Sequence, residues 1–216
     1  MVRAIILPGN GCSGPSIRTS NFYGTLATSL EKSNLFSTVI ASPLPDPNRA
    51  RRSIWLPHIK DVIGVDEETV IIGHSSGAEA TLRLIETEKV LGVVLVSACN
   101  TDLGDAGERE SGWYPPSGGP WQWQNMKQNT QWIIQFHSTD DPFIDISEAR
   151  HVHKMLGGDS ENNQYYEFKD RSHFFDTSDS DVIFEKIVDK VVGMVEPAPA
   201  CGTQDSDDDV RSVESS

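Results

Sequence analysis

The chain has 216 residues, of which 37% are hydrophobic and 23% charged, and its formal net charge is −14 at pH 7. A chain of this length can bury a core and support an enclosed site. The acidic excess argues against nucleic acid and anionic membranes as partners, because both attract basic surfaces. It favours a neutral or cationic small-molecule substrate. No apolar run approaches the ~20 residues that cross a bilayer.

The N-terminus and the cysteines indicate a cellular compartment. The apolar stretch within residues 1–7 is too short for a signal peptide and runs directly into a glycine turn, so we expect it to be the opening strand. Three cysteines, Cys12, Cys99 and Cys201, do not make a disulfide framework. We therefore expect a reduced, cytoplasmic location, with the nucleus as the alternative.

Short apolar runs alternate with segments of helical periodicity along the chain. The predicted strands are residues 4–7, 38–41, 69–72, 93–97, 132–136 and 165–168. The predicted helices are residues 21–32, 53–63, 76–87, 147–156 and 182–195, and an irregular stretch is expected over 99–121. Such alternation predicts an α/β protein with a mostly parallel sheet of about six strands and helices on both faces. Residues 1–196 form the one predicted domain, and the acidic residues 197–216 are expected to be a disordered tail.

The most informative local pattern is Gly73-His74-Ser75-Ser76-Gly77, which matches G-x-S-x-G. It follows an apolar strand and precedes a helix, and in that context the motif forms the nucleophile elbow of α/β-hydrolases. The turn presents the serine hydroxyl at the end of the sheet, and its glycines avoid collisions with the adjoining elements. We therefore predict a three-layer α/β-hydrolase fold with Ser75 as nucleophile. The alternative is that Ser75 only caps a glycine-rich helix N-terminus.

A serine nucleophile needs a base to take its proton and an acid to orient that base. In this fold the partners follow the serine in the order acid, then histidine, each after a strand. The fifth predicted strand is followed by Asp140 and Asp141, of which we favour Asp141 and keep Asp140 as the alternative. His173, in the loop before the final helix, is the predicted base.

The oxyanion of an acyl-transfer reaction needs two backbone donors about 3 Å from the reacting oxygen. One should be the amide of Ser76, the residue after the nucleophile. The other should come from the turn Gly9-Asn10-Gly11 that follows the first strand, where glycine lets the backbone approach closely. Asn10 and Gly11 remain alternatives for this second donor.

Several unusual strings along the chain resemble those of one known family. They include Pro8-Gly9-Asn10-Gly11, Ser53-Ile54-Trp55-Leu56-Pro57, Ile71-Ile72-Gly73-His74-Ser75-Ser76-Gly77-Ala78, Asp102-Leu103-Gly104-Asp105, Pro120-Trp121-Gln122-Trp123 and Ser138-Thr139-Asp140-Asp141-Pro142-Phe143. On these segments, residues 3–195 resemble the retinoblastoma-binding protein 9 family, a group of compact serine hydrolases of the α/β-hydrolase fold.

This resemblance implies a triad of Ser75, Asp141 and His173, and it favours Asp141 over Asp140. It also implies hydrolysis of small esters or amides, including aminoacyl compounds, without a metal or an organic cofactor. The cap would be minimal. The aromatic residues Trp113, Tyr114, Trp121 and Trp123 either cover the site in place of a large lid or pack on the edge of the sheet.

One segment departs from the family pattern. The retinoblastoma-protein docking motif, L-x-C-x-E, corresponds to Ile63-Gly64-Val65-Asp66-Glu67, which has neither the leucine nor the cysteine. We therefore do not expect binding to the retinoblastoma protein.

Two other classes of protein are alternatives to the serine hydrolase. A binding or scaffold protein could keep the fold and act through surface contacts, but three reactive side chains in the correct order argue against it. A metal hydrolase is disfavoured because His151-x-His153 has no nearby carboxylate or cysteine set.

Overall fold

The computed structural model describes residues 1–195 of the protein, and within them six strands form one parallel sheet. The spatial order of the strands is β2-β1-β3-β4-β5-β6. Their bounds are Arg3–Leu7 (β1), Thr38–Ile40 (β2), Thr69–His74 (β3), Val90–Val96 (β4), Thr130–Ser138 (β5) and Asn163–Phe168 (β6). The predicted α/β class and the six-stranded parallel sheet are thereby confirmed. The predicted tail, 197–216, lies outside the described residues, so the domain boundary stays a prediction.

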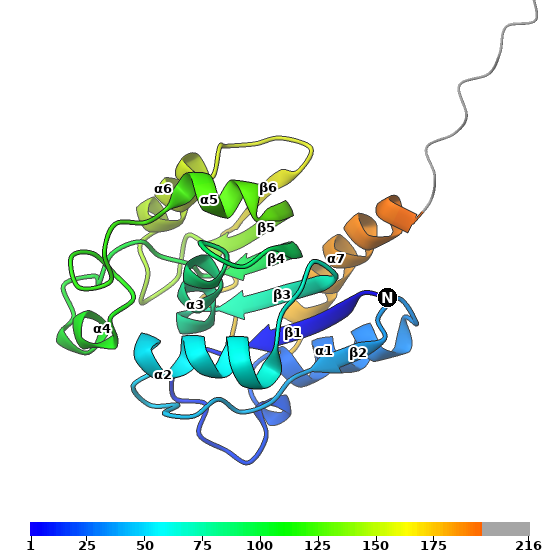
Figure 1. Ribbon diagram of the computed structural model, residues 1–216, viewed down its shortest axis with the longest axis horizontal. Helices are drawn as coiled ribbons and strands as arrows, with labels where there is room; N and C mark the ends of the chain where they lie inside the picture. Colours follow the sequence, from blue (N-terminus) through cyan, green and yellow to red (C-terminus); the bar gives the residue numbers. More distant parts are fainter. Residues whose placement is uncertain (196–216) are drawn as a thin grey trace, which may run out of the picture.

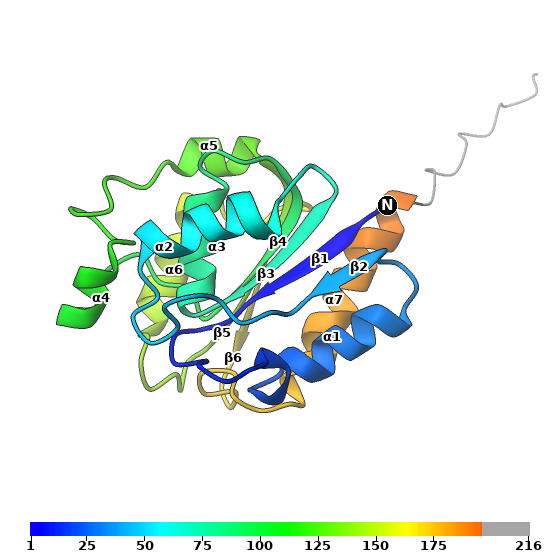
Figure 2. The ribbon, with the colours of Figure 1, turned by 60° about the horizontal axis from the view of Figure 1, so that its bottom comes forward.

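Helices cover both faces of the sheet, as Figures 1 and 2 show. One face carries α1 (Tyr23–Lys32) and α7 (Asp179–Val195), which lie side by side. The opposite face carries α2 (Arg52–Pro57), α3 (Ser76–Leu84), α5 (Trp123–Gln128) and α6 (Ile146–Met155). These three layers are the predicted arrangement.

The central strands are apolar without interruption because alternate side chains enter two different cores. In β1, Ile5 and Leu7 join the core under α2 and α3, whereas Ala4 and Ile6 join the core under α1 and α7. The same alternation holds along β3 and β4, whose residues are all buried. Such strands have no polar face, so helices must cover both sides.

The predicted helix over 53–63 is two elements in the structure. The α-helix α2 ends at Pro57, and a π-helix continues over His58–Ile63. Proline has no amide hydrogen to continue the α-helical ladder. The wider turn ends with the amide of Gly64, which donates to the carbonyl of Ile59 across five residues.

The prediction that residues 99–121 are wholly irregular was wrong, because this stretch contains α4 (Ala106–Ser111). Asp105 caps the helix by accepting a 3.0 Å hydrogen bond from the amide of Glu108, and Gly112 ends it in a left-handed conformation at φ 81°. Helix α5 was not predicted either, and α7 begins at Asp179, three residues before the predicted start.

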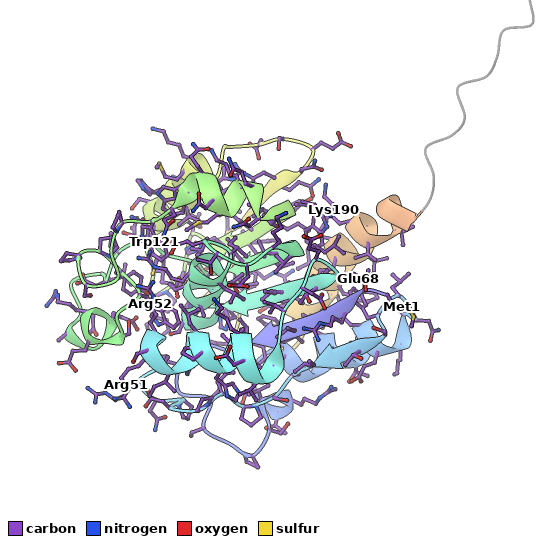
Figure 3. All side chains as sticks on the ribbon, in the orientation of Figure 1. Met1, Arg51, Arg52, Glu68, Trp121 and Lys190 are labelled. Carbon is purple, nitrogen blue, oxygen red and sulfur yellow. The ribbon has the colours of Figure 1, made fainter. Side chains whose placement is uncertain are left out.

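The two ends of the strands carry different features. Met1 and Glu68 form an ion pair of 2.8 Å near the amino ends of β1 and β3 (Figure 3). Toward the carboxyl ends lie Arg52 and Trp121, beside the long segment that carries α4 (Figure 3). The carboxyl ends are where open parallel sheets place their ligand sites.

Candidate active site

Ser75 occupies a strained turn between β3 and α3. Its backbone lies at φ 53° and ψ −125°, a positive-φ conformation that a non-glycine residue rarely adopts. The neighbouring glycines allow this turn to pack tightly. A Cβ atom added to Gly73 would lie 2.3 Å from the carbonyl oxygen of Gly77, and one added to Gly77 would lie 2.3 Å from that of Leu7. The tight turn between β3 and α3 therefore leaves room only for glycine at positions 73 and 77.

The side chain of Ser75 opens into a cavity of about 580 Å³ at the carboxyl end of the sheet. His173 lines the same cavity, and so do Ser76 and Asn10. The structure thus brings together four of the predicted site residues from three separate segments, which follow β1, β3 and β6. Asp141 lies behind His173, with its side chain fully buried.

Asp141, and not Asp140, contacts His173. The Oδ2 atom of Asp141 lies 2.7 Å from Nδ1 of His173, and Oδ1 accepts hydrogen bonds from the amides of Phe143 and Ile144. Burial alone would raise the pKa of Asp141, but these three hydrogen bonds hold it below its ordinary value. An ionised carboxylate can only accept, so Nδ1 of His173 carries the hydrogen and Nε2 is left as the basic nitrogen.

Asp140 has a different role, because it fastens the loop that carries His173. Its Oδ1 atom accepts hydrogen bonds from the hydroxyl of Ser138, at 2.5 Å, and from the amide of Ser172, at 2.9 Å. The loop is further fixed by an ion pair of 2.9 Å between Arg171 and Asp179. On either side of His173, Ser172 and Phe174 adopt positive φ angles of 48° and 56°.

The backbone donors of the Gly9-Asn10-Gly11 turn are not equivalent. The amide of Gly9 donates to the hydroxyl of Tyr23 at 3.0 Å, and the amide of Gly11 donates to the carbonyl of Pro47 at 2.8 Å. Asn10 lines the cavity and Gly11 does not. Of the two predicted alternatives, only Asn10 has an amide that is not already donated within residues 1–195.

One wall of the cavity carries acidic side chains that sequence analysis did not single out. Glu79, Asp105 and Glu108 all line it. Burial raises the pKa of Glu79 well above its ordinary value, and it raises that of Glu108 as well. The carboxyl of Glu79 accepts a hydrogen bond from the amide of Cys99, and that of Glu108 accepts one from the hydroxyl of Tyr114. A positive charge entering the cavity would be stabilised at this wall.

Another part of the cavity lining, next to His173, is aromatic. Phe143 and Phe175 flank the ring of His173 at centroid distances of 5.1 and 5.2 Å, and their side chains are largely exposed. Neither phenylalanine stood out in the sequence, because a single aromatic residue in a loop has no periodic pattern.

Of the four aromatic residues proposed either to cover the site or to pack at the edge, only Tyr114 lines the cavity. Trp113 is fully buried and donates to the carbonyl of Ala50, and Trp121 stacks on the guanidinium of Arg83 at 3.8 Å. Trp123 packs against Trp121. Three of the four are thus packing residues, and the cap is minimal.

The helices and the possible metal ligands bear on what else the protein could bind. None of the helices within residues 1–195 is long and apolar enough to span a membrane. In the same part of the chain, no group of three or more His, Cys, Asp or Glu side chains is arranged so that it could hold a metal ion.

His137 is buried behind Asp141 and does not line the cavity. Its Nε2 donates a hydrogen bond to the carbonyl of Ile144.

A parallel sheet between two helical layers is common to several α/β folds, and similarity to solved structures identifies this one as the α/β-hydrolase fold. The ydeN gene product of B. subtilis superposes with a TM-score of 0.73 at 18% identity, over 89% of this chain and all of its own (100%). A serine hydrolase from Cycloclasticus zankles superposes with a TM-score of 0.62 at 14% identity, over 91% of this chain and 92% of its own.

Sequence comparison identifies the family. The model of a family described as serine hydrolase matches residues 43–174. The rat protein serine hydrolase RBBP9 (Rattus norvegicus) is 42% identical over 196 residues, which cover 91% of this chain and 97% of the rat protein. The chain therefore belongs to the serine hydrolase family that includes RBBP9, and it is an enzyme of the hydrolase class.

Proposed function

We propose that the protein hydrolyses small esters or amides by two-step acyl transfer, with Ser75 as nucleophile, His173 as base and Asp141 as the acid that orients the base. The observation that carries this proposal is the meeting of the Ser75 elbow and the His173–Asp141 pair at one cavity.

In the first step, Nε2 of His173 accepts the proton of Ser75 while the serine oxygen attacks the substrate carbonyl carbon. Within residues 1–195 the Ser75 hydroxyl makes no hydrogen bond, so its contact with His173 has to close in the substrate complex, as is common for such pairs. His173 then gives the proton to the leaving group. In the second step, His173 takes a proton from water as the water oxygen attacks the acyl-enzyme, and it returns that proton to Ser75 as the acid product leaves.

The amides of Ser76 and Asn10 are the donors that we propose for the tetrahedral oxyanion. Both residues line the cavity beside Ser75. The amides of Gly9 and Gly11 are already donated elsewhere, which supports Asn10 over Gly11. Removing one such donor typically raises the barrier by about 2.7–4 kcal/mol.

The walls of the cavity favour an aminoacyl substrate. A protonated amino group on the acyl part would be attracted by the carboxylates of Asp105 and Glu108, and the buried carboxyl of Glu79 lines the same wall. The leaving group must lie near His173 to be protonated, which places it beside Phe143 and Phe175. The family resemblance independently includes aminoacyl compounds among the substrates.

The experiment that tests this function is turnover of fluorogenic aminoacyl and simple acyl substrates by the wild-type protein and by Ser75→Ala. We expect measurable turnover that Ser75→Ala abolishes and that Ser53→Ala, an exposed serine on α2, leaves unchanged. Equal turnover by wild type and Ser75→Ala would contradict the proposal.

A further inference from the structure

A chain of hydrogen bonds runs beneath the cavity from the oxyanion turn to the loop of the base. The hydroxyl of Tyr23 lies 2.6 Å from Nδ1 of His74, and Nε2 of His74 lies 2.8 Å from the carbonyl oxygen of His173. The hydroxyl of Tyr23 also accepts from the amide of Gly9, at 3.0 Å, and from the side-chain amide of Asn21, at 3.2 Å. Tyr23 and His74 are both buried.

The direction of each hydrogen bond follows from the groups involved. A carbonyl oxygen only accepts, so Nε2 of His74 must carry the hydrogen that points at His173. Burial lowers the pKa of His74 to about 3, so the ring is neutral and its Nδ1 is an acceptor. The hydroxyl of Tyr23 therefore donates to Nδ1. Its oxygen is then free to accept from Gly9 and Asn21. Every donor in this chain of hydrogen bonds therefore has an acceptor.

Both ends of this chain belong to the proposed acyl-transfer machinery. At one end is the backbone of His173, between two residues that adopt positive φ angles. At the other end is Gly9, whose neighbour Asn10 is a proposed oxyanion donor. Gly9 itself approaches the nucleophile so closely that an added Cβ would lie 3.2 Å from Cβ of Ser75.

We propose that His74 and Tyr23 are positioning residues that hold the base and the oxyanion turn in register with Ser75. This inference rests on the proposed function. His74 is the variable position of the elbow motif, so the segment that exposes the nucleophile also carries the side chain that fixes the base. Tyr23 links His74 to the oxyanion turn, because its hydroxyl contacts both Nδ1 of His74 and the amide of Gly9.

The first test is Tyr23→Phe, which removes the hydroxyl and keeps the ring. Rates are measured per active site, and the sites are counted by the burst of product from a slowly deacylating ester. We expect kcat per site to fall by roughly tenfold to hundredfold with little change in KM, because small misplacements of reacting groups have effects of this size. Tyr166→Phe is the matched control, because within residues 1–195 the hydroxyl of Tyr166 contacts only Gln164.

A purely structural role gives a different result. In that case Tyr23→Phe lowers the fraction of titratable sites, and kcat per remaining site stays within about twofold of wild type. That outcome would overturn the inference.

The second test compares two substitutions of His74. His74→Gln keeps an N–H near the position of Nε2 and can still donate to the carbonyl of His173, whereas His74→Leu cannot. We expect His74→Gln to retain roughly tenfold more kcat per site than His74→Leu. Equal values for the two variants would contradict a positioning role for this hydrogen bond.

A third measurement does not depend on activity. In the ¹⁵N spectrum of histidine-labelled protein, His74 should show a hydrogen on Nε2 and a bare Nδ1. The opposite tautomer would overturn the hydrogen-bond chain while leaving the hydrolase function intact. Conversely, a folded wild-type protein with the expected tautomer but no titratable site would overturn the proposed function, and the positioning role with it.

Discussion

The Oδ2 atom of Asp141 lies 2.7 Å from Nδ1 of His173, although the two residues are 32 positions apart in the chain. The loops after β5 and β6 bring them together, because the carboxyl ends of neighbouring parallel strands lie at the same edge of the sheet. This contact determines which nitrogen of His173 is basic.

The two adjacent aspartates provide a matched pair for testing this contact. Asp141→Asn removes the carboxylate that selects the tautomer of His173, and we expect kcat to fall by about 10⁴-fold, as for the loss of such an acid in other serine hydrolases. Asp140→Asn loosens only the loop anchor at Ser138 and Ser172, and its effect should be much smaller. The measurement is steady-state kcat of both variants on one ester. Equal losses of kcat in the two variants would refute Asp141 as the residue that orients His173.

The oxyanion donors can be identified by their amide protons. After Ser75 is trapped with a phosphonate, whose oxygen occupies the oxyanion position, we expect downfield shifts of the amide protons of Ser76 and Asn10. The amide of Gly11 should shift little, because it stays bound to the carbonyl of Pro47. Two-dimensional ¹H–¹⁵N spectra with and without the phosphonate show this directly. A large shift at Gly11 with none at Asn10 would reverse the assignment.

The acidic wall makes a prediction about substrate charge. Glu108→Gln keeps an acceptor for the hydroxyl of Tyr114 but removes the negative charge. We expect kcat/KM for an aminoacyl ester to fall about tenfold, equivalent to about 1.4 kcal/mol, because the charge-charge attraction to the protonated amino group is lost. The N-acetylated form of the same ester should be unaffected.

Glu110→Gln is the control for this experiment, since Glu110 lies on the same helix but pairs with Arg49 and does not line the cavity. If Glu108→Gln lowers the rates for the charged and the neutral ester equally, the wall does not recognise the amino group.

The buried, neutral His74 predicts a pH dependence of stability. Its pKa is about 3 in the folded protein and 6.5 in an unperturbed chain. As the pH falls below 6.5, His74 takes up a proton in the unfolded chain but stays neutral in the folded protein. The free energy of unfolding therefore has its full contribution from His74 above pH 6.5 and loses it progressively toward pH 3. The slope for one such group is at most about 1.4 kcal/mol per pH unit.

Urea denaturation between about pH 4.5 and 6 measures this slope. His74→Gln cannot take up the proton, so its free energy of unfolding should depend less steeply on pH than that of the wild type. The exposed His151 offers a surface control, His151→Gln, which should keep the wild-type slope. Identical slopes for wild type and His74→Gln would show that His74 is not held neutral by the fold.

How much the sequence predicts depends on whether a signal is local. The elbow around Ser75 and the strand that precedes it are contained in a few residues, and the sheet follows from uninterrupted apolar runs. The residues alone could not choose between Asp140 and Asp141, because the choice depends on the turn in which the amides of Phe143 and Ile144 bind one carboxylate.

Other features have no local signal. Helix α4 has no apolar stripe, and its only sequence mark is the cap from Asp105 to Glu108. The contact between Tyr23 and His74 joins positions 51 residues apart, and no periodicity of either segment indicates it. The acidic wall likewise exists only after α3 and α4 approach the same cavity.

The most direct test of the central claim is to find where a covalent intermediate forms. The folded protein is treated with a fluorophosphonate, and the modified residue is located by peptide mass mapping. We predict one adduct, on Ser75, that is absent from Ser75→Ala. An adduct on another residue, or none on folded wild-type protein, would contradict the acyl-transfer mechanism.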